Sequence, residues 1–336
     1  MAVSTTSEIA APSARIVEAR SLRRRGPAAL RGWTDPDGLF RRLCTTFGAA
    51  IIALLALLIY ELARGSQLSI SKFGLGFVFS KAWDPVGETF GAATFVYGTL
   101  VTSAIALLIA VPLGVGVAIF LVEMAAPRAN VAIGFLVELL AAIPSIVYGL
   151  WGLFVLAPLV RDYLAPALHS VLGFIPLFSG ESHGVGMLTA GIILSVMIVP
   201  FIAAVSRDVI ASVPRGQREG SLALGATKWE TIWRVVLPYG RGGIAGAVIL
   251  ALGRALGETM AVTMVIGNSP QIVASLFAPG YTMSSVIANE YSEASGPVYL
   301  SALTELGLLL FVVTFVVNGL ARVLIWRMAG GSRVRA

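Results

Sequence analysis

The chain has 336 residues, of which 57% are hydrophobic and only 12% charged, and its mean hydropathy is +0.86. Soluble domains carry about 25% charged residues. The composition therefore excludes a water-soluble enzyme, a disordered protein and a nucleic-acid-binding domain, in spite of a net charge of +6. A single cysteine, Cys44, excludes an internal disulfide and a cysteine-based metal site. We expect an all-α integral membrane protein.

The first 42 residues are polar, rich in arginine and without an apolar run. They do not read as a signal peptide, because the first apolar segment starts too late and no small-residue cleavage site follows it. We expect residues 1–42 to be a disordered cytoplasmic leader that orients the first span. Contact of Arg23, Arg24 and Arg25 with a lipid surface is the alternative.

Six segments are apolar and long enough to cross a bilayer, which requires about 20 residues in a helix. They are expected at about 43–60, 94–122, 131–160, 187–205, 242–268 and 298–321. These spans predict one six-helix domain over residues 43–327, followed by a short cytoplasmic tail at 328–336.

The distribution of basic residues predicts the orientation of these spans. Lysine and arginine number 8 before the first span, 1 at 123–130, 6 at 206–241 and 4 after the last span. The alternate loops at 61–93, 161–186 and 269–297 carry 3, 1 and 0. Because cytoplasmic loops are enriched in lysine and arginine, both termini are expected in the cytoplasm.

The largest cytoplasmic loop, residues 206–241, predicts two short helices. Ser212 can cap the first, with Pro214 in its opening turn, where a missing N–H has no consequence. Gly225 suits the left-handed backbone that ends a helix. Thr227, with Glu230 three residues later, then predicts a capping box at the start of the second helix.

The second helix of this loop carries large apolar residues at helical spacing. Trp229, Ile232, Trp233 and Val236 follow the i, i+3, i+4, i+7 pattern and predict one apolar face. Leu237-Pro238 is expected to end the helix, since proline disrupts a helix interior. The apolar face needs a cover: the bilayer surface, the chain's own spans or a partner protein.

The same loop resembles the cytoplasmic EAA loop of binding-protein-dependent ABC importer permeases. The family pattern of Glu, then Gly, then Leu-Pro is present at the family spacing as Glu219, Gly225 and Leu237-Pro238. Gly220 and Ser221 stand where the family has two alanines. In that family the loop enters a groove on the ATPase subunit. The resemblance therefore implies a coupling element that contains Glu219, Gly220, Ser221, Gly225, Trp229, Leu237 and Pro238.

Longer stretches narrow the resemblance. Residues 141–152, 253–268 and 275–285 are similar to phosphate importer permeases of the PstC type. The resemblance implies a type I ABC importer bundle in a bacterial inner membrane that conducts inorganic phosphate. It also implies a second, PstA-type permease, two ATPase subunits and an extracytoplasmic phosphate-binding protein. No cofactor is expected on this chain, because ATP and magnesium would be held by the ATPase subunits.

Two charged residues lie within the predicted fifth span. Arg254 is expected near the bilayer midplane, and Glu258, four residues later, would share its helix face and pair with it. One interpretation is a structural salt bridge in the bundle interior. The other is an anion gate, in which the planar guanidinium binds phosphate and Glu258 competes for it. The family resemblance points to the gate.

Three further residues are weaker candidates for the translocation pathway. Glu138 lies within the third span and either pairs with a neighbour or lines the pore. Pro144 predicts a bend or a polar cavity beside Ser145. Tyr148 is a further candidate, although a tyrosine in this position is more often a packing or interface residue than a ligand. His169 and His183 have no third ligand at a usual spacing, so we expect no metal site there.

The sequence also lacks the motif that ATP hydrolysis would require. Lys72, Lys81 and Lys228 follow Ser, Ser and Thr, so no Gly-Lys-Ser/Thr phosphate loop is present. ATP hydrolysis is expected on another chain, and this subunit is not expected to be an enzyme. Two alternatives stay open: a permease for another oxyanion, such as sulfate or molybdate, and an ion-coupled secondary transporter or channel.

Overall fold

The computed structural model describes residues 36–329, so the predictions for residues 1–35 and 330–336 lie outside the described part. By internal contacts the chain divides into two units, which meet between Tyr60 and Glu61. The long helices are α2 (Pro36–Gly65), α5 (Ala93–Ile119), α6 (Pro127–Ala142), α10 (Met187–Ala211), α13 (Leu237–Gly257) and α16 (Pro297–Ala329). The short helices are α3 (Gln67–Phe73), α4 (Gly76–Phe79), α7 (Ser145–Trp151), α8 (Ala157–Leu159), α9 (Ala165–Leu172), α11 (Arg215–Ala223), α12 (Lys228–Thr231), α14 (Met260–Val265) and α15 (Met283–Glu290).

Several helices contain or adjoin wider or narrower turns. Four π-helical segments are η1 (Phe120–Met124), η2 (Gly152–Leu156), η3 (Val160–Leu164) and η5 (Ile232–Val236), and one 3₁₀ turn is η4 (Pro176–Phe178). A two-stranded antiparallel hairpin pairs β1 (Trp83–Asp84) with β2 (Thr89–Phe90). π-helical turns are rare and occur often at functional sites.

The first unit consists, within the described residues, of α2 up to Tyr60. The helix begins at Pro36, seven residues before the predicted start of the first span. Proline is well suited to the first helical position, and Asp37 in the first turn complements the positive end of the helix dipole. Residues 36–42, assigned to the leader by the sequence, are therefore helical.

The number of predicted spans is confirmed, since six helices of residues 36–329 are long and apolar enough to cross a membrane. Their boundaries differ most in the third and fifth spans. The six run over Asp37–Gly65, Ala93–Met124, Ser145–Leu172, Met187–Ala211, Lys228–Gly257 and Pro297–Ile325.

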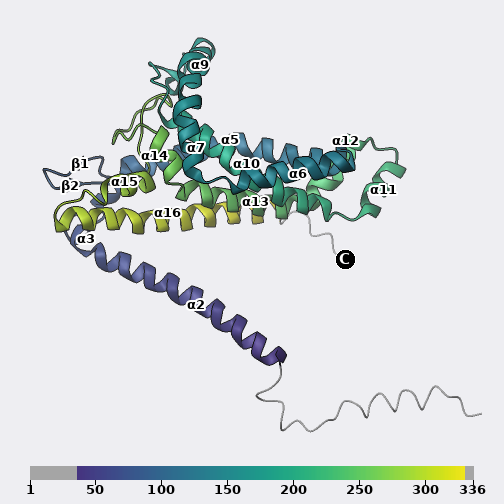
Figure 1. Ribbon diagram of the computed structural model, residues 1–336, viewed down its shortest axis with the longest axis horizontal. Helices are drawn as coiled ribbons and strands as arrows, with labels where there is room; N and C mark the ends of the chain where they lie inside the picture. Colours follow the sequence, from purple (N-terminus) through teal and green to yellow (C-terminus); the bar gives the residue numbers. More distant parts are fainter. Residues whose placement is uncertain (1–35, 330–336) are drawn as a thin grey trace, which may run out of the picture. The chain divides into compact units, whose positions relative to one another are not determined.

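The predicted third span is broken in its middle. α6 ends at Ala142, Ile143 and Pro144 have extended backbone, and α7 starts at Ser145. Proline disfavours the helical conformation of the preceding residue and has no N–H for the helix ladder, so the break falls where the sequence predicted a bend. From Ser145 a continuous helical run through α7, α8 and α9 reaches Leu172, and it turns away from α6 (Figure 1).

The fifth span begins inside the loop that was predicted to precede it. One helical run extends from Lys228 through Pro238 to Gly257, so the expectation that Leu237-Pro238 ends a helix is wrong. The turn before Pro238 is the π segment η5. We attribute the tolerance of Pro238 to this wider turn, which relieves the clash between the ring and the preceding turn.

The second unit is built around the contact between α5 and α10, which lie side by side (Figure 1). A Cβ atom added to Gly114 of α5 would lie 2.8 Å from Ile202 of α10. A Cβ atom on Gly191 of α10 would lie 2.5 Å from Ile105 of α5. The two helices therefore approach each other through one glycine on each, as is common in membrane helix pairs.

The end of this unit that carries the hairpin holds an aromatic cluster. Trp83 and Phe90 of the hairpin pack against Phe95 and Tyr299, with Trp83 edge-on to Phe95 at a centroid distance of 4.7 Å. The carboxylate of Glu290 accepts hydrogen bonds from Trp83 Nε1 at 2.8 Å and from the Tyr299 hydroxyl at 2.6 Å. α11 and α12 lie at the opposite end of the same unit (Figure 1).

Substitution of Gly114 tests the close approach of α5 and α10. Gly114→Ala is expected to lower the free energy of unfolding by about 1–3 kcal/mol, because the methyl group overpacks against Ile202. Gly116→Ala is the matched control, since a Cβ atom there meets nothing within 4 Å. Thermal unfolding of the detergent-solubilised protein measures both, and equal effects of the two substitutions would contradict the packing argument.

Candidate functional site

The two broken spans lie against each other. A Cβ atom on Gly149 of α7 would lie 2.6 Å from Met264 Sδ and 3.1 Å from the Ala261 backbone of α14. One on Gly152 would lie 2.9 Å from Val265. Only glycine permits this approach, so α7 and α14 pack directly. Interrupted helices within a membrane leave backbone polar groups near the midplane, a recurrent feature of transporter binding sites.

The break in the fifth span lies directly after Arg254. α13 ends at Gly257, and Arg254 is therefore in its last turn, where the partial negative charge of the helix end stabilises a cation. The guanidinium Cζ lies 4.5 Å from the centroid of the Phe201 ring of α10. A cation over an aromatic face is attracted by the ring quadrupole. The Arg254 side chain is exposed. Within residues 36–329 it forms no ion pair with a carboxylate.

The predicted pairing of Arg254 with Glu258 is wrong in this structure. The i+4 spacing brings two side chains together only in a continuous helix, whereas Glu258 has extended backbone, with φ −69° and ψ 132°. Glu258 Oε1 instead accepts a hydrogen bond from the backbone N–H of Ala261 at 3.3 Å. Its backbone carbonyl accepts one from Ser284 Oγ at 3.0 Å. The carboxylate thus satisfies a backbone donor in the first turn of α14.

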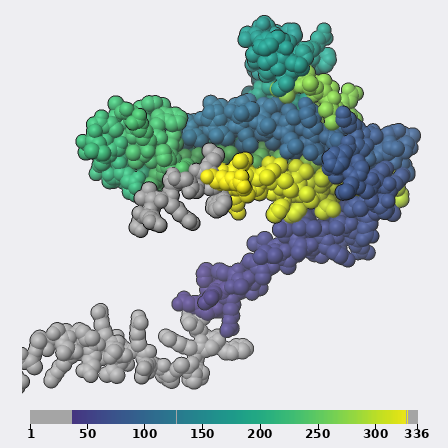
Figure 2. Space-filling model, turned by 180° about the vertical axis from the view of Figure 1, so that it is seen from behind, coloured from purple at the N-terminus to yellow at the C-terminus, as the bar shows by residue number. Residues whose placement is uncertain are grey.

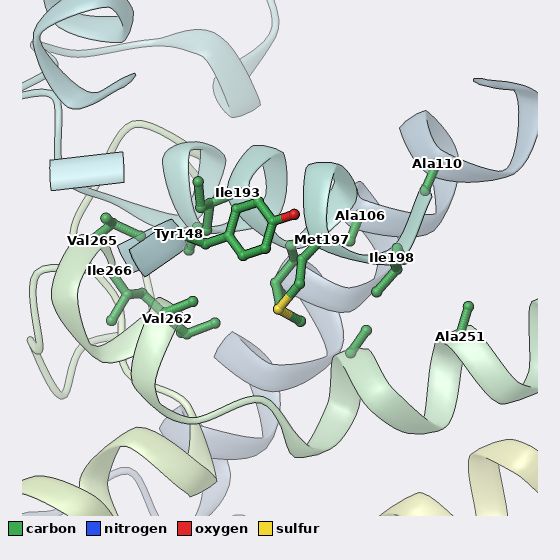
Figure 3. Close-up of a cluster of buried hydrophobic side chains, with 14 of the residues drawn as sticks. Ala106, Ala110, Tyr148, Ile193, Met197, Ile198, Ala251, Val262, Val265 and Ile266 are labelled. Atoms are coloured by element: carbon green, nitrogen blue, oxygen red, sulfur yellow. The ribbon is translucent and has the colours of Figure 1, made fainter. Parts of the chain in front are cut away.

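Tyr148 is part of the packed interior beside this site (Figure 3). Only 7% of its surface is exposed, and its hydroxyl donates to the Leu140 carbonyl at 2.7 Å. Leu140 lies in the last turn of α6, and its carbonyl also accepts a hydrogen bond from the Ile143 N–H at 3.3 Å. The hydroxyl therefore bridges the break in the third span, a packing role. Ser145, half-buried, opens α7.

Glu138 is paired rather than isolated. Its Oε1 lies 3.1 Å from Nη2 of Arg207 on α10. Arg207 lies over Gly134 of α6, where a Cβ atom would come within 2.6 Å of its Nη1. The geometry favours the neighbour-pairing interpretation of Glu138 over pore lining.

The histidines take no part in a metal site within residues 36–329. In that part of the chain no group of three or more His, Cys, Asp or Glu side chains could hold an ion. His169 Nδ1 lies 2.9 Å from the Phe178 carbonyl.

The loop at 206–241 forms two helices near the predicted positions. Gly225 has φ +86°, in the left-handed region, as expected of a helix stop. The capping box at Thr227 is confirmed, with Glu230 Oε2 accepting from the Thr227 N–H at 2.9 Å and the Thr227 hydroxyl accepting from the Glu230 N–H at 3.2 Å. The predicted cap at Ser212 is wrong. Its hydroxyl donates to the Val209 carbonyl at 2.7 Å, and α11 begins only after Pro214.

The predicted apolar face of the second helix divides into two. Ile232 and Val236 are fully buried against residues of α5 and α10. Trp229 and Trp233 are 53% and 55% exposed and lie edge-to-face with centroids 5.9 Å apart. The segment that carries them forms a separate end of the second unit (Figure 2). One side of the helix thus packs on the spans, and the tryptophan pair is left on the surface.

The other predicted loop residues have distinct surroundings. Glu219 and Gly220 are exposed on α11, and Ser221 Oγ lies 3.0 Å from Thr231 Oγ1 of α12. Leu237 packs beside the buried cluster that contains Val236, and Pro238 is exposed at the start of α13.

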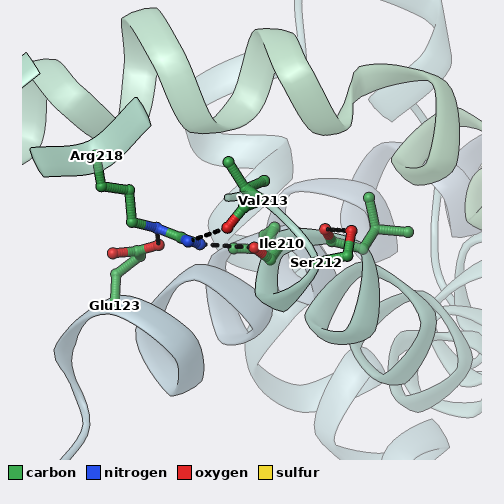
Figure 4. Close-up of polar contacts among 6 residues, drawn as sticks. Glu123, Ile210, Ser212, Val213 and Arg218 are labelled. Carbon is green, nitrogen blue, oxygen red and sulfur yellow. Dashed lines mark hydrogen bonds and ion pairs between the residues drawn. The ribbon is translucent and has the colours of Figure 1, made fainter. Parts of the chain in front are cut away.

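The sequence analysis missed a partly buried ion pair between this loop and the spans. Arg218 Nε donates to Glu123 Oε1 at 3.0 Å, and the two side chains are 18% and 10% exposed (Figure 4). Arg218 directly precedes the Glu219 of the recognised motif, but its partner lies 95 residues earlier in the chain. No local pattern joins the two.

Comparison with known proteins identifies the family. The family of binding-protein-dependent transport system inner membrane components matches residues 110–330. The chain belongs to this family.

Among the curated members, the phosphate transport system permease protein PstC of Mesorhizobium japonicum is 49% identical over 307 residues. That alignment covers 90% of this chain and 93% of the relative. The PstC protein of Pasteurella multocida is also 49% identical, over 86% of this chain and 92% of its own length. A more distant relative, the probable PstC protein of Methanocaldococcus jannaschii, is 42% identical over 74% of this chain and 81% of its own.

Chains of solved ABC transporters share the fold. A chain of a bacterial alginate ABC transporter, crystallised with an alginate-bound periplasmic protein, superposes with a TM-score of 0.58 at 19% identity. The match covers 89% of this chain and 98% of that one. The architecture is therefore that of an ABC importer permease, a transporter subunit whose ATPase resides on separate chains.

Tyr148→Phe tests the bridge across the broken third span. Removing the hydroxyl leaves the partly buried Leu140 carbonyl with only the hydrogen bond from the Ile143 N–H, which is expected to cost about 1 kcal/mol of unfolding free energy. Tyr163→Phe is the control, because Tyr163 is 70% exposed on the same helical run. Thermal unfolding in detergent compares the two. A Tyr148→Phe protein as stable as wild type would remove the bridging role.

Proposed function

We propose that this chain is the membrane-spanning subunit of an ATP-driven importer of inorganic phosphate. The observation that carries the proposal is 49% identity, over 90% of the chain, to a permease named for phosphate transport. One of the stretches that resemble phosphate permeases, 253–268, includes Arg254 and the break in the fifth span. The stretch of sequence that suggested the family therefore contains the candidate site.

In this proposal the chain encloses half of a translocation pathway and a PstA-type permease encloses the other half. Two ATPase subunits dock on the cytoplasmic loops, and an extracytoplasmic phosphate-binding protein delivers the substrate. Both termini lie in the cytoplasm, as the arginine distribution indicates. ATP and magnesium belong to the ATPase subunits.

Arg254 is the proposed phosphate contact. Its planar guanidinium offers donors that match two phosphate oxygens, and the helix end and the Phe201 ring hold it without occupying those donors. Glu258, four residues later, repels a second anion and competes for Arg254 whenever the two side chains meet. Ser145 is a further candidate contact at the start of α7, whereas Tyr148 and Glu138 have structural partners.

Loss of the guanidinium should abolish the substrate contact. In cells that lack this chain, wild type is expected to restore uptake of radiolabelled phosphate that excess sulfate does not inhibit. Arg254→Gln is expected to lower that uptake at least about tenfold, the value of a charged hydrogen bond. Arg254→Lys is expected to be intermediate, since it keeps the charge and loses the fork.

Arg322→Gln, an exposed arginine on α16, is the control for general loss of positive charge. Assembly is checked by copurification of the ATPase subunits. Normal uptake by an assembled Arg254→Gln complex would end the proposed role of Arg254. Wild-type rescue that sulfate or molybdate inhibits would assign another oxyanion.

The exposed tryptophan pair should matter for docking of the ATPase subunits. Trp229→Ala and Trp233→Ala are each expected to weaken copurification, because buried tryptophans at interfaces commonly contribute about 2 kcal/mol or more to binding. Trp151→Ala, an exposed tryptophan on α7, is the matched control. Undiminished copurification with both tryptophans replaced would place the ATPase contact elsewhere on the chain.

A further inference from the structure

The first loop helix, α11, is attached to the spans mainly by one side chain. None of its described side chains is buried, and Leu222 is 48% exposed. Its link to α12 is the contact between the Ser221 and Thr231 hydroxyls. It is linked to the spans by Arg218, whose guanidinium contacts Glu123 (Figure 4).

Arg218 holds two spans at once. Its Nε donates to Glu123 Oε1 at 3.0 Å, in the π segment that ends α5. Its Nη2 donates to the Ile210 carbonyl at 2.7 Å, in the last turn of α10, and its Nη1 donates to the Val213 carbonyl just beyond. Carbonyls at a helix end lack helical partners and attract a cation. The guanidinium therefore serves as both ion-pair partner and helix cap.

The partial burial of this pair strengthens it. Exposed ion pairs contribute little, but these two side chains are only 18% and 10% exposed, so separating them would leave a partly buried charge unpaired. The three acceptors also fix the plane of the guanidinium. An ammonium group could satisfy the charge of Glu123, but it could not reproduce the planar fork.

The second loop helix reaches the same span ends by apolar contact. Ile232 and Val236 bury against Ala118 and Ile119 at the end of α5 and Ile210 of α10. Both halves of the loop thus converge on one place, the adjoining ends of α5 and α10. These two helices also share the most extensive contact between any two described elements of the second unit.

We propose that Arg218 and Glu123 form the joint through which the loop displaces α5 and α10 during transport. Both are positioning residues, and the proposal rests on the proposed function. The apolar contact can slide, because dispersion has no direction, whereas the hydrogen-bonded fork fixes both distance and angle. Without the hydrogen bonds of the Arg218 guanidinium, the ATPase subunits would still dock and hydrolyse ATP. The loop would then move without displacing α5 and α10.

The test uses the complete complex in proteoliposomes, with its binding protein and phosphate, and measures uptake and ATP hydrolysis in the same sample. Arg218→Gln is expected to keep the ATPase subunits bound and to lower phosphate imported per ATP at least about tenfold, as expected for loss of a partly buried, charged hydrogen bond. Glu123→Gln is expected to lose less, because Arg218 still caps α10. Arg215→Gln, an exposed arginine on the same helix, is the matched control.

Two further variants separate a joint from a simple salt bridge. Glu123→Gln combined with Arg218→Gln should be no worse than Arg218→Gln alone, because both act through one contact. The charge swap, Glu123→Arg with Arg218→Glu, should not restore coupling, since a carboxylate at 218 would face the Ile210 and Val213 carbonyls.

The proposed joint would be contradicted if uptake and ATP hydrolysis fell in proportion in the Arg218→Gln complex. It would also be contradicted if that complex were fully active. Rescue by the charge swap would contradict it too, because it would reduce the contact to an ion pair. Wild-type complex that hydrolyses ATP without importing phosphate would instead refute the proposed function.

Discussion

The direct contact of α7 with α14 is the constraint on which the polar site depends. Each of these short helices follows a break in a span, and a break exposes backbone groups that a bilayer cannot satisfy. Gly149 and Gly152 let the two segments approach so closely that each covers the other. The freed groups are then satisfied locally, by the Tyr148 hydroxyl on Leu140 and by the Glu258 carboxylate on Ala261. Larger residues at the two glycine positions would separate the breaks and leave those groups facing lipid.

The continuity of the fifth span joins this site to the loop at the other end of the unit. Trp229 and Arg254 lie on one uninterrupted helical run, and at 1.5 Å per residue they are about 37 Å apart along it. In the importer we propose, a push at the tryptophan pair reaches the guanidinium through a single rigid element rather than through a hinge at Pro238. The π segment before Pro238 supports this continuity, because it lets the helix accept a proline that would otherwise end it. Arg218 adds a second route, through α5 and α10.

What the sequence could predict was local or statistical. The six spans, the stop at Gly225 and the capping box at Thr227 follow from runs of apolar residues and from spacings of three or four. The errors arose where tertiary packing decides. The continuous helix assumed for Arg254 and Glu258 ends at Gly257, and the end assumed at Pro238 is bridged by a π turn. The partnership of Arg218 with Glu123 joins residues 95 positions apart, a distance at which a single sequence carries no signal.

The broken fifth span changes the argument for Arg254 rather than removing it. A guanidinium paired with a carboxylate at i+4 would be neutralised, and an anion would have to displace that carboxylate before binding. In this structure the last turn of α13 and the Phe201 ring stabilise the charge instead, and neither occupies the donors of the fork. An unpaired arginine within a membrane protein is costly. In the importer we propose, that cost favours occupation of the fork by an anion, and the carboxylate of Glu258, which lies between α13 and α14, limits how strongly the anion is held. Transport needs binding strong enough to enter and weak enough to leave, and this arrangement of one cation and one displaced carboxylate meets both conditions.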